Sequence, residues 1–365
     1  MQSVRRGRIW QNFILLLFST LFSLIALELG VRCVRGKILD TSLLSVVLRE
    51  NEGESEQAKR YDSYLGWVPN PGTRVMEGWN ETNLEEGIRS NGINRPTSFV
   101  SDHVILATGD SFTHGTAAED HETWPAYLES FSRTQVINGG VGAYGLDQSV
   151  LRTELLASEY QPSLVVVSFI PDDIQRCRMS VHGQAKPYFI VDGDQLVLQN
   201  VPVPLPEGEE AREPDWFRGV FGYSHLVDFI MRRVAFYYWL DHRVILAGFR
   251  GKTRSPGDDS AGSIGCLLMR HLAQLRDQRD VEIVVLAQYT KSLRPDYHEK
   301  SLFVLDCARK EGLHVLDLYD AMSDARQSDP KRYNGLFRGH MTGKGNEFVA
   351  KELMRFLEAQ GLLTK

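Results

Sequence analysis

Residues 104–115 read VILATGDSFTHG, and an apolar run there stops abruptly at Gly109, Asp110 and Ser111. The run VILAT is short and uncharged, as expected of a strand buried inside a parallel sheet. In open parallel sheets, ligands bind at the carboxyl ends of the strands. Ser111 therefore follows a strand at the position where such a sheet places functional groups.

Similar apolar runs alternate with helix-like segments along most of the remaining chain. The other strand-like runs are TQVIN (134–138), SLVVVSFI (163–170), VEIVVLAQ (281–288) and HVLDL (314–318). Helical spacing of apolar residues is found at 124–131, 149–160, 264–277, 302–312 and 347–361. Strands that alternate with helices predict parallel βαβ units. We therefore expect an α/β fold, a three-layer α/β/α flavodoxin-like sandwich with about five parallel strands.

Residues 175–262 interrupt this alternation. KPYFIVDGDQLVLQNVPVP (186–204) holds two β-like runs around Asp192-Gly193, a favoured hairpin turn. A Pro- and Glu-rich loop follows, then a long aromatic helical pattern (223–245) and a polar return (250–263). We expect an inserted subdomain over the carboxyl edge of the sheet.

The first forty residues differ in composition from the rest of the chain. No Asp, Glu, Lys or Arg occurs from Ile9 to Leu27, 19 residues that would span about 28 Å as a helix. This length is close to the hydrocarbon thickness of a bilayer. No small-residue cleavage site follows, so an uncleaved transmembrane helix is favoured over a secretory signal. A buried core helix is the alternative. Basic residues flank both sides almost equally, so charge does not orient the span.

These patterns predict the domain organisation. Residues 1–40 form a membrane anchor, and residues 41–100 form a polar spacer followed by an N-terminal extension. The extension includes YLGWVPNPG, whose aromatic and turn residues indicate order. Residues 101–365 form the main domain, with the insertion at 175–262.

Bulk composition excludes some classes of function. A net charge of −6 gives no global attraction to nucleic acid. The four cysteines show no CxxC spacing, which disfavours a zinc site or a redox motif. Cys307 lies in an apolar helical pattern that predicts a core position. One disulfide stays open as an alternative if the domain lies outside the cytoplasm.

Four short segments are candidates for chemistry. Ser111 would sit at a helix amino terminus, where free N–H groups favour a serine nucleophile and a developing oxyanion. It could instead be only a helix N-cap. The loop VINGGVGAYGLDQ (136–148) could bring a backbone N–H close to a ligand, or could be an ordinary turn.

The other two segments carry titratable groups. FIPDDIQR (169–176) places Asp172 and Asp173 at the end of the third strand, where they could also simply cap a turn. LFRGHMTGKGNEFVA (336–350) places His340 in a loop before the last helix. A histidine is the usual base for a serine hydroxyl, and His340 is the first choice among ten histidines because of its place in the chain order.

Taken together, these segments resemble the SGNH, or GDSL, hydrolase family. GDSFTHG resembles its nucleophile block, NGGVGAYG its glycine block, and GHMTGKGN its histidine block, while FIPDDI stands where the family has Gly-x-Asn-Asp. The resemblance covers about 103–170 and 264–360. YLGWVPNPG and KPYFIVDGDQLVLQNVPVP resemble membrane-anchored bacterial members with an insertion.

The resemblance implies an activity and a set of roles. Ser111 would attack an ester carbonyl and His340 would take its proton. The oxyanion would be held by the N–H groups of Ser111 and Ala143 and by the side chain of Asp172. No metal or organic cofactor is implied. Anchored members usually face outward, which favours a periplasmic or cell-surface domain.

Three positions depart from the family pattern. Ala143 replaces a glycine, which matters little because the chemistry uses the backbone N–H. Asp172 replaces an asparagine, and an ionised carboxylate cannot donate a hydrogen bond. Phe337 and Arg338 occupy the positions of the acid that orients the histidine. Asp320 or Asp329 could substitute if the fold brings one close; otherwise a Ser–His dyad and a slower enzyme are expected.

Two hypotheses follow from the sequence. The first is a membrane-anchored hydrolase of esters, such as O-acetyl groups of an envelope glycan, acting through an acyl-Ser111 intermediate. The second is a related protein without catalysis that binds glycan or supports envelope assembly. A nucleotide-binding α/β protein is a weaker interpretation, because GDSFTHG lacks both GxGxxG and the P-loop lysine.

Overall fold

The computed structural model describes residues 2–34, 58–76, 79–92, 103–182, 184–205, 216–234 and 261–363. Most of the predicted spacer, the Pro- and Glu-rich loop and most of the polar return lie outside these residues. The chain forms two compact units, of which the smaller holds residues 1–57 and 208–246. The larger holds residues 58–207 and 247–365.

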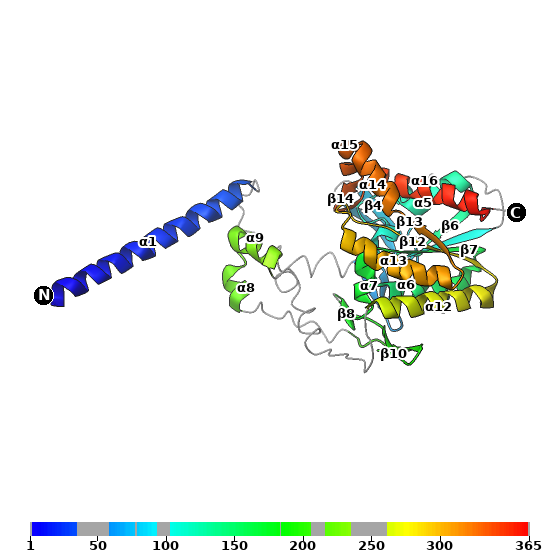
Figure 1. The fold of residues 1–365 in the computed structure, drawn as a ribbon, viewed down its shortest axis with the longest axis horizontal. Helices are drawn as coiled ribbons and strands as arrows, with labels where there is room; N and C mark the ends of the chain where they lie inside the picture. The colour runs from blue at the N-terminus through cyan, green and yellow to red at the C-terminus, as the bar shows by residue number, and fades with distance from the viewer. Residues whose placement is uncertain are drawn as a thin grey trace. The chain divides into compact units, whose positions relative to one another are not determined.

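The larger unit is built on a five-stranded sheet (Figure 1). Its strands are β5 (Val104–Thr108), β6 (Gln135–Asn138), β7 (Leu164–Phe169), β12 (Glu282–Ala287) and β13 (His314–Asp317). Their spatial order is β13-β12-β7-β5-β6, and every neighbouring pair is parallel. Counted along the chain this order is 2-1-3-4-5, that of flavodoxin-like folds. The predicted fold class is confirmed.

Helices cover both faces of this sheet (Figure 1). On one face α5 (Trp124–Ser132) packs against α16 (Gly343–Gln360). On the other face α12 (Ala261–Arg279) packs against α6 (Leu146–Tyr160) and α13 (Pro295–Lys310). The central strand β7 is buried along its whole length. This two-sided cover explains why its sequence LVVVSF shows no polar face.

Shorter elements complete the larger unit. The hairpin predicted around Asp192-Gly193 is confirmed as β10 (Tyr188–Asp192) and β11 (Gln195–Gln199). The others are β1 (Lys59–Asp62), β2 (Gly66–Pro69), β3 (Gly72–Met76), β4 (Trp79–Asn83), α4 (Ser111–His114), η1 (Asp120–Glu122), α7 (Pro171–Arg176), β8 (Val181–His182), β9 (Gln184–Ala185), α14 (Tyr319–Ser328), α15 (Pro330–Asn334), β14 (Phe337–Arg338) and β15 (His340–Met341).

Residues 58–92 pack onto the sheet domain. Trp67 in β2 is fully buried in the hydrophobic core. Arg89 extends the β6 edge through an antiparallel bridge to Asn138. The buried Arg89 guanidinium donates to Asp120 Oδ1 at 2.8 Å and to the Ala118 carbonyl at 2.9 Å. A buried cation is retained only when it is paired in this way, so these bonds fix the extension to the loop after α4.

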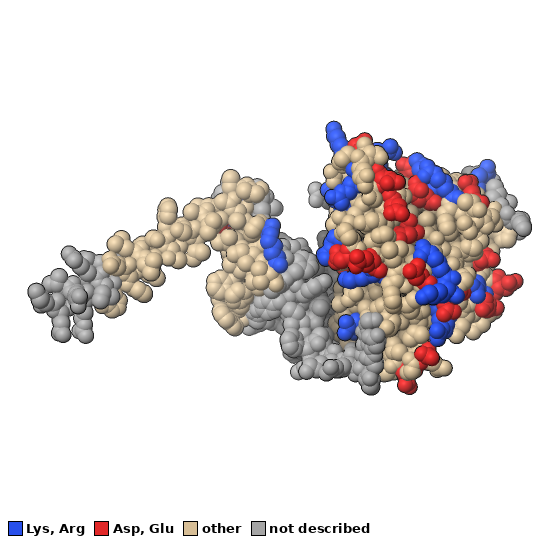
Figure 2. Space-filling view, viewed as in Figure 1, with Lys and Arg blue, Asp and Glu red and all other residues tan. Residues whose placement is uncertain are grey.

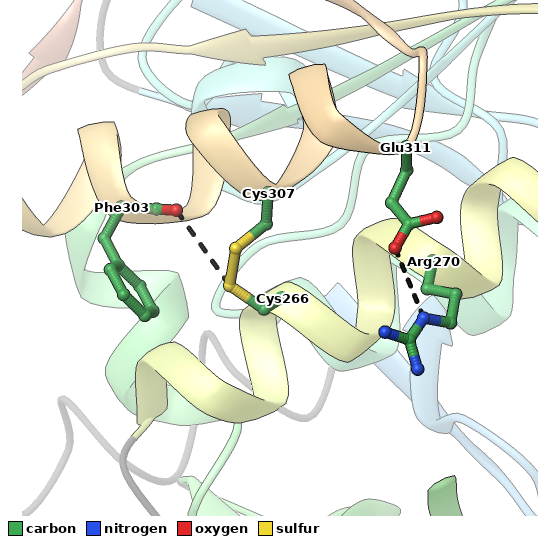
Figure 3. The surroundings of a disulfide bond; sticks show 5 residues. All are labelled: Cys266, Arg270, Phe303, Cys307 and Glu311. Carbon is green, nitrogen blue, oxygen red and sulfur yellow. Dashed lines mark hydrogen bonds and ion pairs between the residues drawn. A yellow bond between two sulfur atoms is a disulfide. The ribbon is translucent and has the colours of Figure 1, made fainter. Parts of the chain in front are cut away.

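A disulfide joins two helices on one face of the sheet (Figure 3). Cys266 of α12 bonds Cys307 of α13, with their Cα atoms 5.2 Å apart. An ion pair between Arg270 Nε and Glu311 Oε1, at 3.2 Å, links the same region. Cys307 is half-buried at the edge of the core rather than enclosed within it, and the disulfide left open by the sequence is formed. The cysteines at 33 and 177 are free.

The smaller unit contains α1 (Gln2–Val34), α8 (Trp216–Phe221) and α9 (His225–Val234). Within α1, Asn12–Val34 is long and apolar enough to cross a membrane. Figure 2 shows a long stretch of this helix without charged atoms. Part of the predicted insertion therefore packs against the N-terminal helix, since α9 contacts α1.

Candidate active site

A tight turn after β5 presents Ser111 at the carboxyl edge of the sheet. Gly109 has φ +155°, and a Cβ there would lie 2.7 Å from the Ser168 carbonyl oxygen, so only glycine fits. Asp110 is the N-cap of α4, because its Oδ1 accepts from Phe112 N at 2.9 Å. Ser111 is consequently the first residue of α4 and not its cap.

The glycine-rich loop after β6 packs directly on the serine turn. Val141 N donates to the Gly109 carbonyl at 2.9 Å. A Cβ on Gly140 would lie 2.3 Å from His114 N, so this close approach needs glycine. Ala143 adopts φ +68°. Among the described residues the N–H groups of Ser111 and Ala143 have no hydrogen-bond partner, which leaves both able to donate to a ligand.

The N-terminal extension braces the glycine-rich loop. Trp67 Nε1 donates to the Gly142 carbonyl at 3.2 Å, and the Tyr144 hydroxyl donates to the Trp67 carbonyl at 2.5 Å. The two rings meet edge to face, with their centroids 5.5 Å apart. Both residues are fully buried. Trp67 therefore holds the turn on either side of Ala143.

A small hairpin carries the histidine. His340 begins β15, which pairs with β14 around Gly339 at φ +77°. Its Nε2 lies 3.0 Å from Ser111 Oγ, across 229 residues of sequence. The Phe112 ring lies against the imidazole, with a centroid distance of 5.4 Å. The structure thus brings the predicted nucleophile and the predicted base into hydrogen-bonding contact.

The electrostatic environment keeps the imidazole neutral. Burial lowers the pKa of His340 below 6.5, and the Arg176 guanidinium lowers it further, while the Asp110 carboxylate raises it. A neutral imidazole whose Nε2 accepts the serine proton is the form that general-base catalysis needs.

The orienting acid of the resembled family has no equivalent on His340 within the described chain. The Arg338 guanidinium lies over the Trp79 ring, 5.0 Å from its centroid. Asp329 caps α15 by accepting from Arg332 N, and Asp320 is exposed in α14. Among the described residues, Ser111 is the one hydrogen-bond partner of the His340 side chain.

A buried pair of carboxyl groups lies next to the serine. Asp110 Oδ2 is 3.3 Å from Ser111 Oγ and 3.8 Å from Arg176 Nη1. The same guanidinium nitrogen bonds Asp173 Oδ1 at 2.5 Å and the Tyr144 carbonyl at 2.9 Å. Burial raises the pKa of Asp110, and burial together with the nearby Asp110 raises the pKa of Asp173 well above its usual range.

Asp172 and Asp173 face different surroundings. Asp173 caps α7, because its Oδ2 accepts from Ile170 N at 2.9 Å, and it faces Arg176. The Asp172 side chain accepts the Tyr297 hydroxyl at 3.1 Å, which links α7 to α13. The structure therefore brings Asp173 into the cluster beside Ser111, and it gives Asp172 no bond to Ser111 or His340.

Sequence reasoning misses three members of this site. The sequence patterns include Asp110 in the GDSFTHG block and Trp67 in the ordered stretch YLGWVPNPG without giving either residue a role, and they do not single out Arg176. The GDS tripeptide could have pointed to Asp110, since Asp is a favoured N-cap. The sequence around Arg176 and Trp67 contains no motif that assigns either residue to the site. Among the described residues no group of three His, Cys, Asp or Glu side chains is arranged to hold a metal ion.

Comparison with known proteins gives structural likeness at low sequence identity. A putative lipolytic protein of the G-D-S-L family from Desulfitobacterium hafniense DCB-2 is 13% identical with a TM-score of 0.40, over 70% of this chain and 100% of that one. A catalytic mutant of an acetylxylan esterase from Geobacillus stearothermophilus is 12% identical with a TM-score of 0.42, over 70% and 94%. The psychrotrophic esterase EstA from Pseudoalteromonas sp. is 10% identical with a TM-score of 0.37, over 71% and 98%.

No protein-family model matches the chain, and no curated protein matches it.

Proposed function

We propose that the protein is a membrane-anchored serine hydrolase that cleaves esters through an acyl-Ser111 intermediate. One observation carries the proposal: Ser111 Oγ lies 3.0 Å from His340 Nε2 at the carboxyl edge of a parallel sheet. Ser111 follows β5, and the strand order reverses between β5 and its neighbours, which is where ligands bind in open α/β sheets.

The chemistry proceeds in two halves. Ser111 Oγ attacks the ester carbonyl carbon while His340 Nε2 takes the hydroxyl proton. The tetrahedral intermediate collapses, the alcohol leaves with the proton from His340, and an acyl-serine remains. Water then attacks the acyl carbonyl, giving its proton to His340, and the carboxylic acid leaves as Ser111 regains its proton.

The oxyanion of each intermediate needs donors that are already in place. We assign this role to the N–H groups of Ser111 and Ala143, which are unpaired within the described chain. Asp172 is the third candidate, and it could donate only in its protonated form. The loss of one such donor costs about 2.7–4 kcal/mol in a comparable site.

His340 acts in this proposal without a hydrogen-bonded acid. The nearest support for the imidazolium formed in each half-reaction is the Asp110 carboxylate, whose charge raises the pKa of His340. This support is electrostatic and does not fix the ring tautomer. A Ser–His dyad of this kind is expected to be slower than a triad.

The substrate class is carried over from the SGNH/GDSL family that the sequence motifs resemble. Esterases, lipases and carbohydrate deacetylases make up most of that family. An O-acetylated envelope glycan is the substrate that we propose for an anchored member.

Two observations support an anchored domain outside the cytoplasm. The side chains of α1 described from Trp10 to Leu27 are solvent-exposed, as expected of a helix that needs a lipid partner. The Cys266–Cys307 disulfide favours an oxidising compartment, because such bonds rarely persist in the cytosol.

Labelling with a fluorophosphonate probe tests the proposal. We expect the probe to modify Ser111 in the native chain and to leave Ser111→Ala unlabelled. Ser292→Ala, which alters an exposed serine in the loop after β12, is the matched control and should label like the native chain. Hydrolysis of a p-nitrophenyl acetate reporter should follow the same pattern.

A glycan-binding or envelope-assembly protein without catalysis is the second candidate. It is favoured by the absence of a hydrogen-bonded acid on His340 within the described chain and by the carboxylate at Asp172. A folded protein that fails to react with the probe at Ser111 would favour this alternative.

A further inference from the structure

The carboxylate of Glu28 in α1 caps the amino terminus of α9. Glu28 accepts from His225 N at 2.9 Å, from Leu226 N at 2.8 Å and from the Ser224 hydroxyl at 2.8 Å. These N–H groups would otherwise lack partners, because the first turn of a helix has no internal acceptors. Arg32 completes the junction by pairing with Glu28 at 2.6 Å and donating to the Tyr223 carbonyl at 2.9 Å.

The junction lies directly after the uncharged part of α1. The side chains described from Trp10 to Leu27 are exposed, whereas Glu28, Val31 and Arg32 are half-buried against α9. The polar contact to α9 therefore begins where the lipid-compatible stretch ends. A carboxylate at the end of such a stretch needs a partner, and α9 supplies it.

The helices α8 and α9 expose large apolar side chains. On α8 these are Trp216 and Val220, with 76% and 63% of their surface exposed. On α9 they are Ile230 and Val234, with 46% and 79% exposed. The Arg233 guanidinium lies 3.5 Å from the centroid of a phenylalanine ring on the same helix. Apolar side chains with an arginine beside them are typical of helices that lie in a membrane interface.

We propose that α8 and α9 lie on the bilayer surface, with Trp216, Val220, Ile230 and Val234 inserted into the boundary between lipid headgroups and acyl chains. The inference rests on the proposed anchor. The bilayer is the surface that covers these side chains, because α9 is hydrogen-bonded to Glu28, the residue that directly follows the uncharged stretch of α1. The lipid that surrounds α1 up to Leu27 would therefore also contact the exposed apolar side chains of α8 and α9.

This arrangement has a topological consequence for the sheet domain. The chain passes between the smaller and the larger unit three times, near residues 57, 207 and 246. The domain that carries Ser111 is accordingly joined to the membrane-bound unit by three chain segments rather than by a single linker.

Spin labelling of the full-length chain in vesicles of phosphatidylethanolamine and phosphatidylglycerol tests the inference. Single cysteines replace Val220 or Val234 in a Cys33→Ser background, since the other native cysteines are either buried or bonded. Phe18→Cys reports on the anchor, and Lys351→Cys on α16 reports on an aqueous surface. Relaxation by oxygen marks lipid, and relaxation by a soluble nickel chelate marks water.

We expect labels at 220 and 234 to respond to oxygen like the label at 18, several-fold more than the label at 351. If they respond like position 351 while position 18 keeps its lipid response, the inference is overturned and the anchor stands. If position 18 also responds as an aqueous site, the anchor itself is overturned. Spin–spin broadening at 220 and 234 that dilution with unlabelled protein removes would show that a second copy covers these helices, and would also overturn the inference.

Discussion

Asp110 and Asp173 face the same guanidinium nitrogen, Arg176 Nη1, from 3.8 and 2.5 Å. Both carboxyl groups are fully buried. A single cation compensates two acids there, so the pair titrates as a unit with apparent pKa values that belong to both. Because Asp110 also lies 3.3 Å from Ser111 Oγ, this pair links proton uptake in the core to the proposed nucleophile.

The first prediction concerns the acid limb of the pH–rate profile. Hydrolysis needs neutral His340, whose pKa burial lowers, so activity should persist to lower pH than a free imidazole would allow and fall as the pH drops through the pKa of His340. Asp110→Asn keeps an acceptor for Phe112 N but removes the charge that raises the pKa of His340. We expect the limb to move to lower pH and kcat to fall about tenfold, near 1.4 kcal/mol, because the imidazolium is less stabilised.

Asp173→Asn is the matched control for that prediction. It keeps an acceptor for Ile170 N and removes the carboxyl group that competes with Asp110 for Arg176. Asp110 should then ionise more readily, and the limb should move to higher pH. Shifts of the same sign in both variants, measured as kcat/KM against pH, would contradict the proposed role of Asp110.

Asp172→Asn tests the assignment of the third oxyanion donor. An asparagine amide can donate to an oxyanion, and its oxygen can still accept the Tyr297 hydroxyl. We expect ester turnover to rise or to persist to higher pH, by up to the roughly 2.7–4 kcal/mol that one donor contributes in a comparable site. Tyr297→Phe removes the same bond without a new donor and should not raise turnover. A large fall in Asp172→Asn would show that the carboxyl group has its own task.

Trp67→Phe tests whether the N-terminal extension supports the glycine-rich loop. The change keeps an aromatic ring in the core but removes the donor to the Gly142 carbonyl. We expect a loss of about 0.5–1.5 kcal/mol in unfolding free energy and, with p-nitrophenyl acetate, a larger fractional change in kcat than in KM. Tyr127→Phe alters a half-buried tyrosine on α5 and serves as a control. If Trp67→Phe is less stable but its kcat is unchanged, Trp67 contributes to packing and does not support the glycine-rich loop in the reaction.

Paired Cys266→Ser and Cys307→Ser substitutions test the disulfide. The bond closes a loop of 41 residues, and removing it should lower the unfolding free energy by about 2–4 kcal/mol. Thermal unfolding should show the loss, and a reducing agent should reproduce it in the native chain. Cys33→Ser, at an exposed free thiol, should leave the transition unchanged. Equal transitions in the oxidised protein and the paired variant would indicate that the bond does not form in solution.

Glu28→Ala tests the junction between α1 and α9. The variant removes the acceptors of His225 N and Leu226 N, a loss worth about 1 kcal/mol for an N-cap. Amide hydrogen exchange in α9 should speed up about fivefold, and Glu28→Gln, which keeps one carbonyl oxygen, should give an intermediate rate. Slow exchange retained in Glu28→Ala would mean that α9 is held by other contacts.

Local patterns are sufficient to predict the sheet domain. The predominantly apolar runs at 163–170 and 281–288 correspond to β7 and β12, because strands covered on both faces are apolar along most of their length. The helix predicted at 302–312 begins earlier, at Pro295. Its first turns are polar, and apolar periodicity does not detect them.

The site is predictable only in part, for a physical reason. Ser111 and His340 stand in motifs whose residue types match a reaction, so they can be proposed from the chain alone. Arg176 and Trp67 matter through contacts with residues that are distant in the sequence, Asp110 and Gly142. The disulfide between α12 and α13 likewise depends on how two helices lie against each other. Such contacts follow from packing and leave no local signal.

The separation of 229 residues between Ser111 and its partner also sets an order of events during synthesis. A growing polypeptide carries the serine long before the ribosome adds the hairpin of β14 and β15. Through that interval the hydroxyl lacks the base that the proposed mechanism assigns to it. On the proposed mechanism, the pairing of Ser111 with His340 can therefore form only after the hairpin of β14 and β15 has been synthesised.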